Sequence, residues 1–286
     1  MLPTKERNGT AVLLSHRDET ILFDCGEGTQ KQMRIMGIPV TKITKILISH
    51  WHGDHVFGLP GLLLTMGASH YNKTLAIYGP KGSKKRFADL QRPWIPQEKI
   101  SLHLKEVSKG IFFDGAYFHL EALPLEHTTQ VIGFSFVEKD KRNINTAYTK
   151  QFGLVKNPIL RDLQAGKDIT WQGKKIKAST ATTLTKGKKI TFLTDTKMCA
   201  NAVRLARNAD ILICEATYDA AMQEKAKEYG HLTAKDAAMI AKKAKVKKLI
   251  ITHFSQRYKD IKALEQEAKQ VFSNTIAAHD FMVYKV

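Results

Sequence analysis

Three histidines and one aspartate lie within six residues, directly after the apolar run at residues 46–48: His50, His52, Asp54 and His55. Imidazole nitrogens and carboxylate oxygens are ligands of zinc-class ions. Side chains alternate along an extended chain, so His50 and His52 share one side, whereas a turn at Gly53 brings Asp54 and His55 to a second position. A solvated histidine-rich loop is the alternative, but such loops seldom follow a buried strand. The sequence therefore predicts a loop that serves two adjacent metal ions.

The charge balance of the chain favours a polyanionic partner. Its 286 residues include 45 Lys and Arg but only 27 Asp and Glu, a formal net charge of +18. Neutralising phosphates releases counterions, which favours binding to nucleic acid, but an anionic membrane surface is equally compatible with this composition. A generally basic surface that maintains solubility is the third interpretation.

Cysteine usage and hydropathy indicate a cytoplasmic protein. The three cysteines (Cys25, Cys199 and Cys214) have no paired spacing, so we expect no disulfide framework. No apolar leader follows Met1, and the longest apolar run, residues 56–66, is too short to span a bilayer and is interrupted by glycine and proline.

Short apolar segments separated by turns predict an α/β sandwich. They come in runs and do not alternate strictly with helices, which argues against a doubly wound sheet. We expect strands at residues 11–14, 20–23, 45–48, 75–78, 116–123, 131–137, 190–193, 211–214, 248–251 and 281–284. We expect helices at residues 29–36, 234–244 and 262–272, the second of them capped by Thr233 with Asp236 three residues later.

Residues 139–177 have a different character. They contain ten Lys or Arg against three acidic residues, a net charge of +7, with Tyr148, Phe152 and Trp171 spread among the charges. Cations that contact phosphates and rings that stack on bases are typical of an arm that grips nucleic acid. A solvated excursion with a small hydrophobic seam is the alternative.

Three more metal ligands are expected at the ends of other strand-like runs. His127, Asp195 and His253 each follow such a run, and loops at one edge of a sheet are where sites are usually built. Each of these residues alone is more often a cap or a satisfied core residue. Together with the first cluster they predict a binuclear centre.

Glu215 and His231 are candidates for an acid–base pair. Glu215 follows the run at residues 211–214, and His231 lies two residues before the predicted helix cap at Thr233. A helix N-terminus disfavours imidazolium, but a nearby carboxylate restores a usable pKa. We therefore predict that the pair acts as a general acid.

These motifs resemble those of the short-form tRNase Z family, tRNA 3′-processing endoribonucleases of the metallo-β-lactamase superfamily. The resemblance extends over nearly the whole chain, and the segments around His231 and at 252–258 are the most specific to this family. The matching segments are residues 3–8, 23–30, 49–55, 79–82, 127, 192–196, 214–218, 231–234 and 252–258.

The resemblance implies a metallo-β-lactamase fold, an αβ/βα four-layer sandwich over residues 1–286, with a protruding basic tRNA-binding arm (exosite) at residues 143–178. It also implies two zinc ions per subunit and a homodimer. One zinc would be held by His50, His52 and His127 and the other by Asp54, His55 and His253, with Asp195 bridging both. Asp54, His231 and Glu215 are the residues expected to be catalytic.

The implied reaction is hydrolytic removal of the 3′ trailer of precursor tRNA, leaving a 3′-hydroxyl on the tRNA and a 5′-phosphate on the trailer. Two alternatives remain. One is a hydrolase of the same fold that acts on small phosphodiesters or (thio)esters, for which the basic excess would have no role. The other is a non-catalytic RNA-binding relative, which would be free to lose ligands.

Overall fold

The computed structural model describes residues 3–93 and 100–286, which form two compact units. The main unit comprises the described residues of Met1–Asp114, Leu120–Phe136 and Lys189–Val286. The insert unit comprises Gly115–His119 and Val137–Lys188. No helix in the described part of the chain is long and apolar enough to cross a membrane.

The first sheet of the main unit has five strands in the order β1-β2-β3-β4-β5. β1 and β2 are antiparallel, and each later neighbour is parallel to the one before it. The strands are β1 (Val12–His16), β2 (Glu19–Phe23), β3 (Lys45–Leu47), β4 (Thr74–Gly79) and β5 (Ser101–Glu106). The associated helices are α1 (Thr29–Ile35), η1 (Val40–Lys42), α2 (Gly53–Val56), α3 (Leu59–Ala68) and α4 (Ser83–Gln91).

The second sheet has seven strands in the order β16-β15-β14-β13-β8-β7-β6, and the run from β13 to β16 is parallel. Its strands are β6 (Gly110–Asp114), β7 (Phe118–Pro124), β8 (Ile132–Glu138), β13 (Lys189–Leu193), β14 (Ile211–Glu215), β15 (Lys248–Thr252) and β16 (Thr275–Ala277). The helices are α8 (Ala200–Ala206), η2 (Ala220–Met222), α9 (Gln223–Tyr229), α10 (Ala234–Ala244) and α11 (Lys262–Val271).

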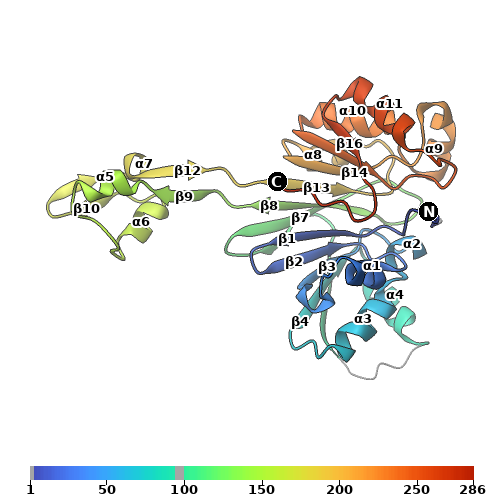
Figure 1. Ribbon diagram of the computed structural model, residues 1–286, viewed down its shortest axis with the longest axis horizontal. Coiled ribbons are helices and arrows are strands. Elements are labelled where there is room, and N and C mark those ends of the chain that lie inside the picture. Colours follow the sequence, from blue (N-terminus) through green and yellow to red (C-terminus); the bar gives the residue numbers. More distant parts are fainter. Residues whose placement is uncertain (1–2, 94–99) are drawn as a thin grey trace. The chain divides into compact units, whose positions relative to one another are not determined.

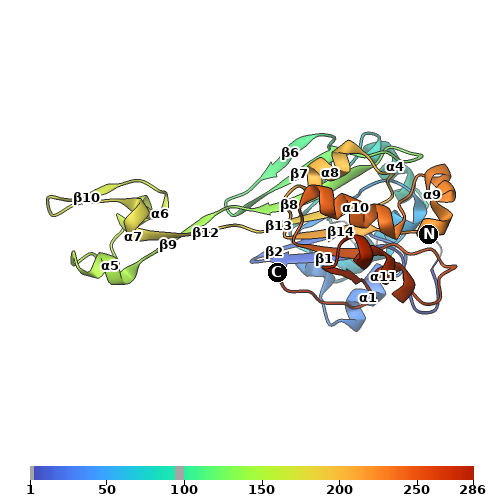
Figure 2. The same ribbon diagram turned by 90° about the horizontal axis from the view of Figure 1, so that it is seen from above.

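The two sheets face each other, with helices on both outer faces (Figures 1 and 2). Phe23 of β2 lies 5.3 Å from Phe192 of β13 and 6.4 Å from Phe134 of β8, measured between ring centroids. Helices α1, α3 and α4 pack on the first sheet, and α8, α10 and α11 pack on the second. This four-layer arrangement confirms the predicted αβ/βα sandwich.

The insert unit has a small core of its own. β9 (Lys141–Ile144) pairs with β12 (Thr182–Thr185), and β10 (Ile169–Trp171) forms a hairpin with β11 (Lys174–Ile176). Helices α5 (Thr146–Lys150), α6 (Leu160–Gln164) and α7 (Ala178–Ala181) complete it (yellow-green in Figure 1). Leu154, Leu163 and Ile176 are fully buried in its centre. A basic segment without sustained apolar periodicity therefore still folds around a few aliphatic side chains.

Nine of the ten predicted strands correspond to strands of the structure, and the predicted capping box of Thr233 and Asp236 is present. The strand predicted at residues 281–284 is wrong. Phe281 has a left-handed φ of 65°, and Val283 is 70% exposed. Residues 281–284 do not pair with β16, the terminal strand of the second sheet, so the apolar alternation there is not buried on a sheet face. The polar strands β5 and β9 lack the apolar runs on which the prediction relied.

Candidate metal centre

The candidate centre lies where strands of both sheets end. β13, β14 and β15 are parallel neighbours, so their carboxyl ends share one edge of the second sheet. Asp195 follows β13, Glu215 ends β14, and His253 follows β15. The loop after β3 brings the first histidine cluster from the other sheet, and His127 comes from the loop between β7 and β8.

All seven predicted ligands come together in two groups that share Asp195. The first group is His50, His52, His127 and Asp195, and the second is Asp54, His55, Asp195 and His253. The ligand atoms within each group lie within 4.8 Å of one another.

The two oxygens of Asp195 face different groups. Its Oδ2 lies 3.5 Å from His50 Nε2, whereas its Oδ1 lies 3.2 Å from His253 Nε2 and 3.4 Å from His55 Nε2. In the first group, His52 Nδ1 lies 3.1 Å from His50 Nε2 and 3.3 Å from His127 Nε2. Neutral imidazoles with their lone pairs turned toward one point are the donor set of a bound cation, so these residues fit a pair of divalent metal ions.

Burial and neighbouring charged groups shift the pKa values of two of these ligands, His52 and Asp195. Burial, reinforced by the neighbouring His50 and His127, lowers the pKa of His52 to about 4. Burial would raise the pKa of Asp195, but His253 and His55 hold it well below its usual range. Neutral histidine and ionised carboxylate are the forms that coordinate metal.

Asp24 orients His55 and was not predicted to have this role. The Asp24 side chain is fully buried, and its Oδ2 lies 2.8 Å from His55 Nδ1. The backbone N–H and the hydroxyl of Ser49 also donate to this carboxylate, each at 2.7 Å. Asp24 directly follows β2, the parallel neighbour of β3, so its position at a strand end was the signal that could have identified it.

Two other ligands are oriented through their second ring nitrogen. His127 Nδ1 lies 2.8 Å from the Gly230 carbonyl oxygen, and His253 Nδ1 lies 3.0 Å from Thr217 Oγ1. Such outer partners fix the tautomer and ring orientation of a ligand histidine. The Gly230 contact could not be predicted from the sequence, because every residue has a backbone carbonyl.

The backbone is unusual at the strand ends that carry the site. Asp24, Asp195 and His253 have φ values of 56°, 41° and 58°. Left-handed conformations are uncommon for residues other than glycine and persist where the surrounding structure enforces them, typically at functional sites. These turns redirect the three side chains at the sheet edge.

The predicted Glu215–His231 pair lies beside the metal groups. His231 Nδ1 is 3.1 Å from Glu215 Oε2, and its ring stacks on His253 with 5.6 Å between centroids. Burial would lower the pKa of His231, but the buried Glu215 carboxylate raises it to about 9. Thr217 and the backbone N–H of Thr196 each donate to Glu215 at 2.6 Å, which fixes the carboxylate. A protonated imidazole is thus held at the edge of the centre.

The chain is similar to known proteins, in sequence and in structure, over its full length. Residues 19–254 match the Beta-lactamase superfamily domain. Ribonuclease Z of Protochlamydia amoebophila is 38% identical, over 99% of this chain and 92% of the relative. Ribonuclease Z of Archaeoglobus fulgidus is 37% identical, over 100% and 94%. The crystal structure of human tRNase Z, short form, superposes with a TM-score of 0.70 at 31% identity, covering 100% of this chain and 95% of that one.

Proposed function

Because the chain belongs to the ribonuclease Z family within the beta-lactamase superfamily, we propose that it is a zinc-dependent endoribonuclease that removes the 3′ trailer of precursor tRNA. The observation that carries the proposal is the pair of ligand groups joined through Asp195, with the Glu215–His231 pair at their edge. That arrangement provides places for two cations and a proton donor around one scissile phosphodiester.

We propose that two zinc ions occupy the centre. His50, His52 and His127 would hold one and Asp54, His55 and His253 the other, with Asp195 shared between them. Nitrogen-rich donor sets of this kind suit zinc, whereas magnesium and calcium prefer oxygen. When bound, two such ions supply Lewis acidity, which makes water nucleophilic near neutral pH and offsets phosphoryl charge.

The residues of the chain would then orient the substrate and move one proton. Attack by water and departure of the tRNA 3′ oxygen leave a 3′-hydroxyl on the tRNA and a 5′-phosphate on the trailer. His231 would give its proton to the departing 3′ oxygen, and Glu215 would stabilise the imidazolium before transfer. Asp54 would act as a ligand at the place where the substrate enters, since it is the least buried carboxylate of the centre.

The insert unit is the proposed tRNA-binding arm, with residues 143–178 at its centre. Lys174 lies over the ring of Phe152, 6.0 Å from the centroid, while Lys150 and Lys156 are exposed. Exposed cations of this kind bind backbone phosphates and so hold tRNA without reading its sequence. We further propose a cytoplasmic homodimer, for which the exposed Ile35 and Met36 at the end of α1 offer an apolar contact surface.

Substrate comparison tests the activity. The zinc-loaded protein should cleave precursor tRNA at one position and hydrolyse bis(p-nitrophenyl) phosphate far less efficiently. Preference for the small diester, with no cleavage of any precursor, would instead favour a small-molecule hydrolase. Zinc binding without hydrolysis of either substrate would favour a non-catalytic RNA-binding protein.

A deletion tests the arm. Removing residues 145–181 and joining the ends with a short turn leaves Ile144 and Thr182, which are directly paired between β9 and β12. We expect this variant to lose precursor tRNA cleavage but to retain hydrolysis of bis(p-nitrophenyl) phosphate. Retained tRNA cleavage would contradict the proposed role of the arm.

A further inference from the structure

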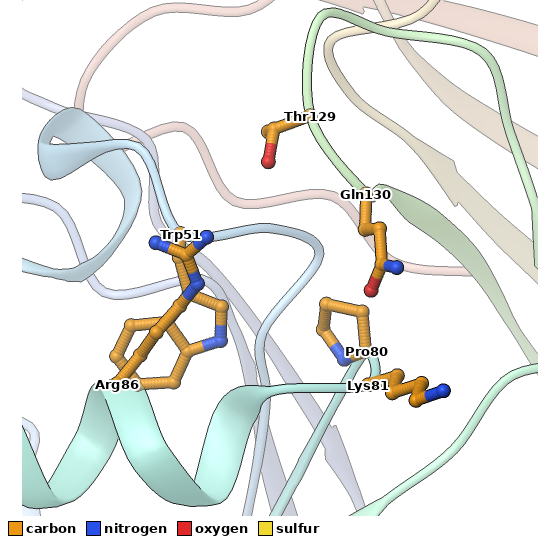
Figure 3. A pocket seen from close by; sticks show the side chains of 6 residues that line it. All are labelled: Trp51, Pro80, Lys81, Arg86, Thr129 and Gln130. Atoms are coloured by element: carbon orange, nitrogen blue, oxygen red, sulfur yellow. The ribbon is translucent and has the colours of Figure 1, made fainter.

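A small basic cavity lies next to the metal centre, within the main unit. Its volume is about 40 Å³, and it is lined by Trp51, Pro80, Lys81, Arg86, Thr129 and Gln130 (Figure 3). Trp51 separates His50 from His52 in the chain, and Thr129 is two residues beyond His127. Since one residue spans at most ~3.6 Å, the Cα atoms of Trp51 and Thr129 lie within about 7 Å of the Cα atom of a candidate ligand.

The wall of this cavity is fixed by hydrogen bonds. The indole Nε1 of Trp51 donates to Ser83 Oγ at 2.7 Å, and the Ser83 hydroxyl donates to the Pro80 carbonyl at 2.6 Å. Ser83 is buried at the first position of α4. The ring of Trp51 is therefore held in place by α4, the same helix that carries Arg86.

In the part of the chain that the structure describes, the cations of the cavity have no acidic side chain as an ion-pair partner. Glu106 accepts the backbone N–H groups of Gly82 and Lys84, each at 3.0 Å, so it is engaged with the start of α4. Within residues 3–93 and 100–286, neither Lys81 nor Arg86 forms an ion pair with an acidic side chain. Two unpaired cations at one small cavity favour an anion as its occupant.

The size of the cavity limits what it can hold. One water requires roughly 10–15 Å³ by the same kind of measure, so a space of about 40 Å³ admits a phosphoryl group but not a nucleotide base. Gln130 lies across the cavity from Trp51 and Arg86 and can donate an amide N–H to such a group (Figure 3).

The cations of the cavity and the proton donor belong to different halves of the sandwich, although Thr129 and Gln130 of the cavity come from the β7–β8 loop of the second sheet. Trp51 and Arg86 come from the β3–α2 loop and from α4, on the side of the first sheet. Glu215 and His231 come from the second sheet and the loop after α9. The proposed proton donor must contact the 3′ oxygen of the tRNA, so the opposite side of the centre is left for the single-stranded trailer.

We propose that this cavity binds the first backbone phosphate downstream of the cleaved bond. Arg86 and Lys81 contact its non-bridging oxygens and hold the trailer, and the scissile phosphate is thereby drawn toward the metal groups. This inference rests on the proposed function, since only a precursor with a trailer of at least two nucleotides carries a second phosphate at that position.

A chemical substitution in the RNA tests the contact. We compare three precursor tRNAs: an unmodified one, one with an uncharged methylphosphonate at the first linkage downstream of the cut, and one with a methylphosphonate at the first linkage upstream. The wild-type holoenzyme should lose about tenfold in kcat/KM on the downstream-modified RNA, the effect of losing one charged hydrogen bond. Arg86→Ala should show a similar loss on unmodified RNA and little further loss on downstream-modified RNA.

Lys85→Ala provides the matched control, since Lys85 is an exposed cation of the same helix that does not line the cavity. We expect its loss on downstream-modified RNA to equal that of the wild type. A precursor with a trailer of one nucleotide gives a second readout, because Arg86→Ala and wild type should cleave it equally well.

Three results would overturn the inference. The first is that the loss in kcat/KM caused by Arg86→Ala and the loss caused by the downstream methylphosphonate add up. The second is that Arg86→Ala lowers cleavage of the precursor with a one-nucleotide trailer as much as it lowers cleavage of the unmodified precursor. The third is that the upstream methylphosphonate, and not the downstream one, causes little further loss in Arg86→Ala. That result would place the cavity on the tRNA side of the cleaved bond. These results require a wild type that cleaves; no cleavage of any precursor by the zinc-loaded wild type would refute the proposed function and this inference together.

Discussion

Replacing Asp24 by asparagine should weaken metal binding, although Asp24 itself is not a predicted ligand. Its carboxylate accepts three hydrogen bonds, from the Ser49 backbone, the Ser49 hydroxyl and His55 Nδ1. Asparagine has the same shape but offers one acceptor oxygen and one NH₂ group. If the oxygen keeps the Ser49 backbone bond, the NH₂ group faces His55 Nδ1, and two donors then oppose each other.

The expected magnitude follows from this count. The Ser49 hydroxyl can rotate and accept from the new NH₂ group, so the net loss is the one bond to His55. A hydrogen bond to a charged group contributes about 1.5–3 kcal/mol, which corresponds to about 10- to 100-fold in an equilibrium constant. Loss of an outer partner of a ligand histidine typically costs about 10- to 100-fold in metal affinity, which agrees.

Competition for zinc against a chromophoric chelator measures this effect directly. Asp18→Asn makes the same chemical change at an exposed position of the β1–β2 turn and should leave zinc affinity unchanged. Circular dichroism of both metal-free variants separates weak binding from loss of fold. Zinc affinity of Asp24→Asn within twofold of wild type, with the fold intact, would refute the reasoning.

Three other substitutions test the site. His231→Ala should lower turnover by about 10²- to 10⁴-fold while leaving tRNA affinity intact; equal losses in single-turnover rate and in binding would reject the acid assignment. Glu215 raises the pKa of His231 to about 9, so His231 stays protonated up to that pH. Glu215→Gln should therefore move the alkaline fall of the kcat–pH profile to lower pH, and an unmoved profile would contradict the pairing. Gly230→Ala should reduce zinc content, because its Cβ would lie 2.7 Å from His127 Nδ1 at a φ of +75°. Gly173→Ala, at a φ of +76° with nothing within 4 Å, is the matched control and should retain zinc.

The layered fold could be predicted because its signals are local. Apolar runs of the right length identified nine strands, and Thr233 with Asp236 identified the start of α10. The strand predicted at residues 281–284 was wrong because strand formation also depends on a partner that is not local in the sequence. An apolar alternation becomes a strand only where a neighbour with free backbone groups lies alongside, and sequence pattern does not specify that neighbour.

The sequence by itself determined which side chains could bind metal, because imidazole and carboxylate chemistry is a property of residue type. Only the tertiary structure decided how these side chains are oriented: Asp24 contacts His55, and the Gly230 carbonyl contacts His127. Those contacts join segments that are distant in the chain, and one of them uses a backbone atom that every residue possesses. Contacts of this kind arise from the packing of the two sheets, so they become visible only when the chain is folded.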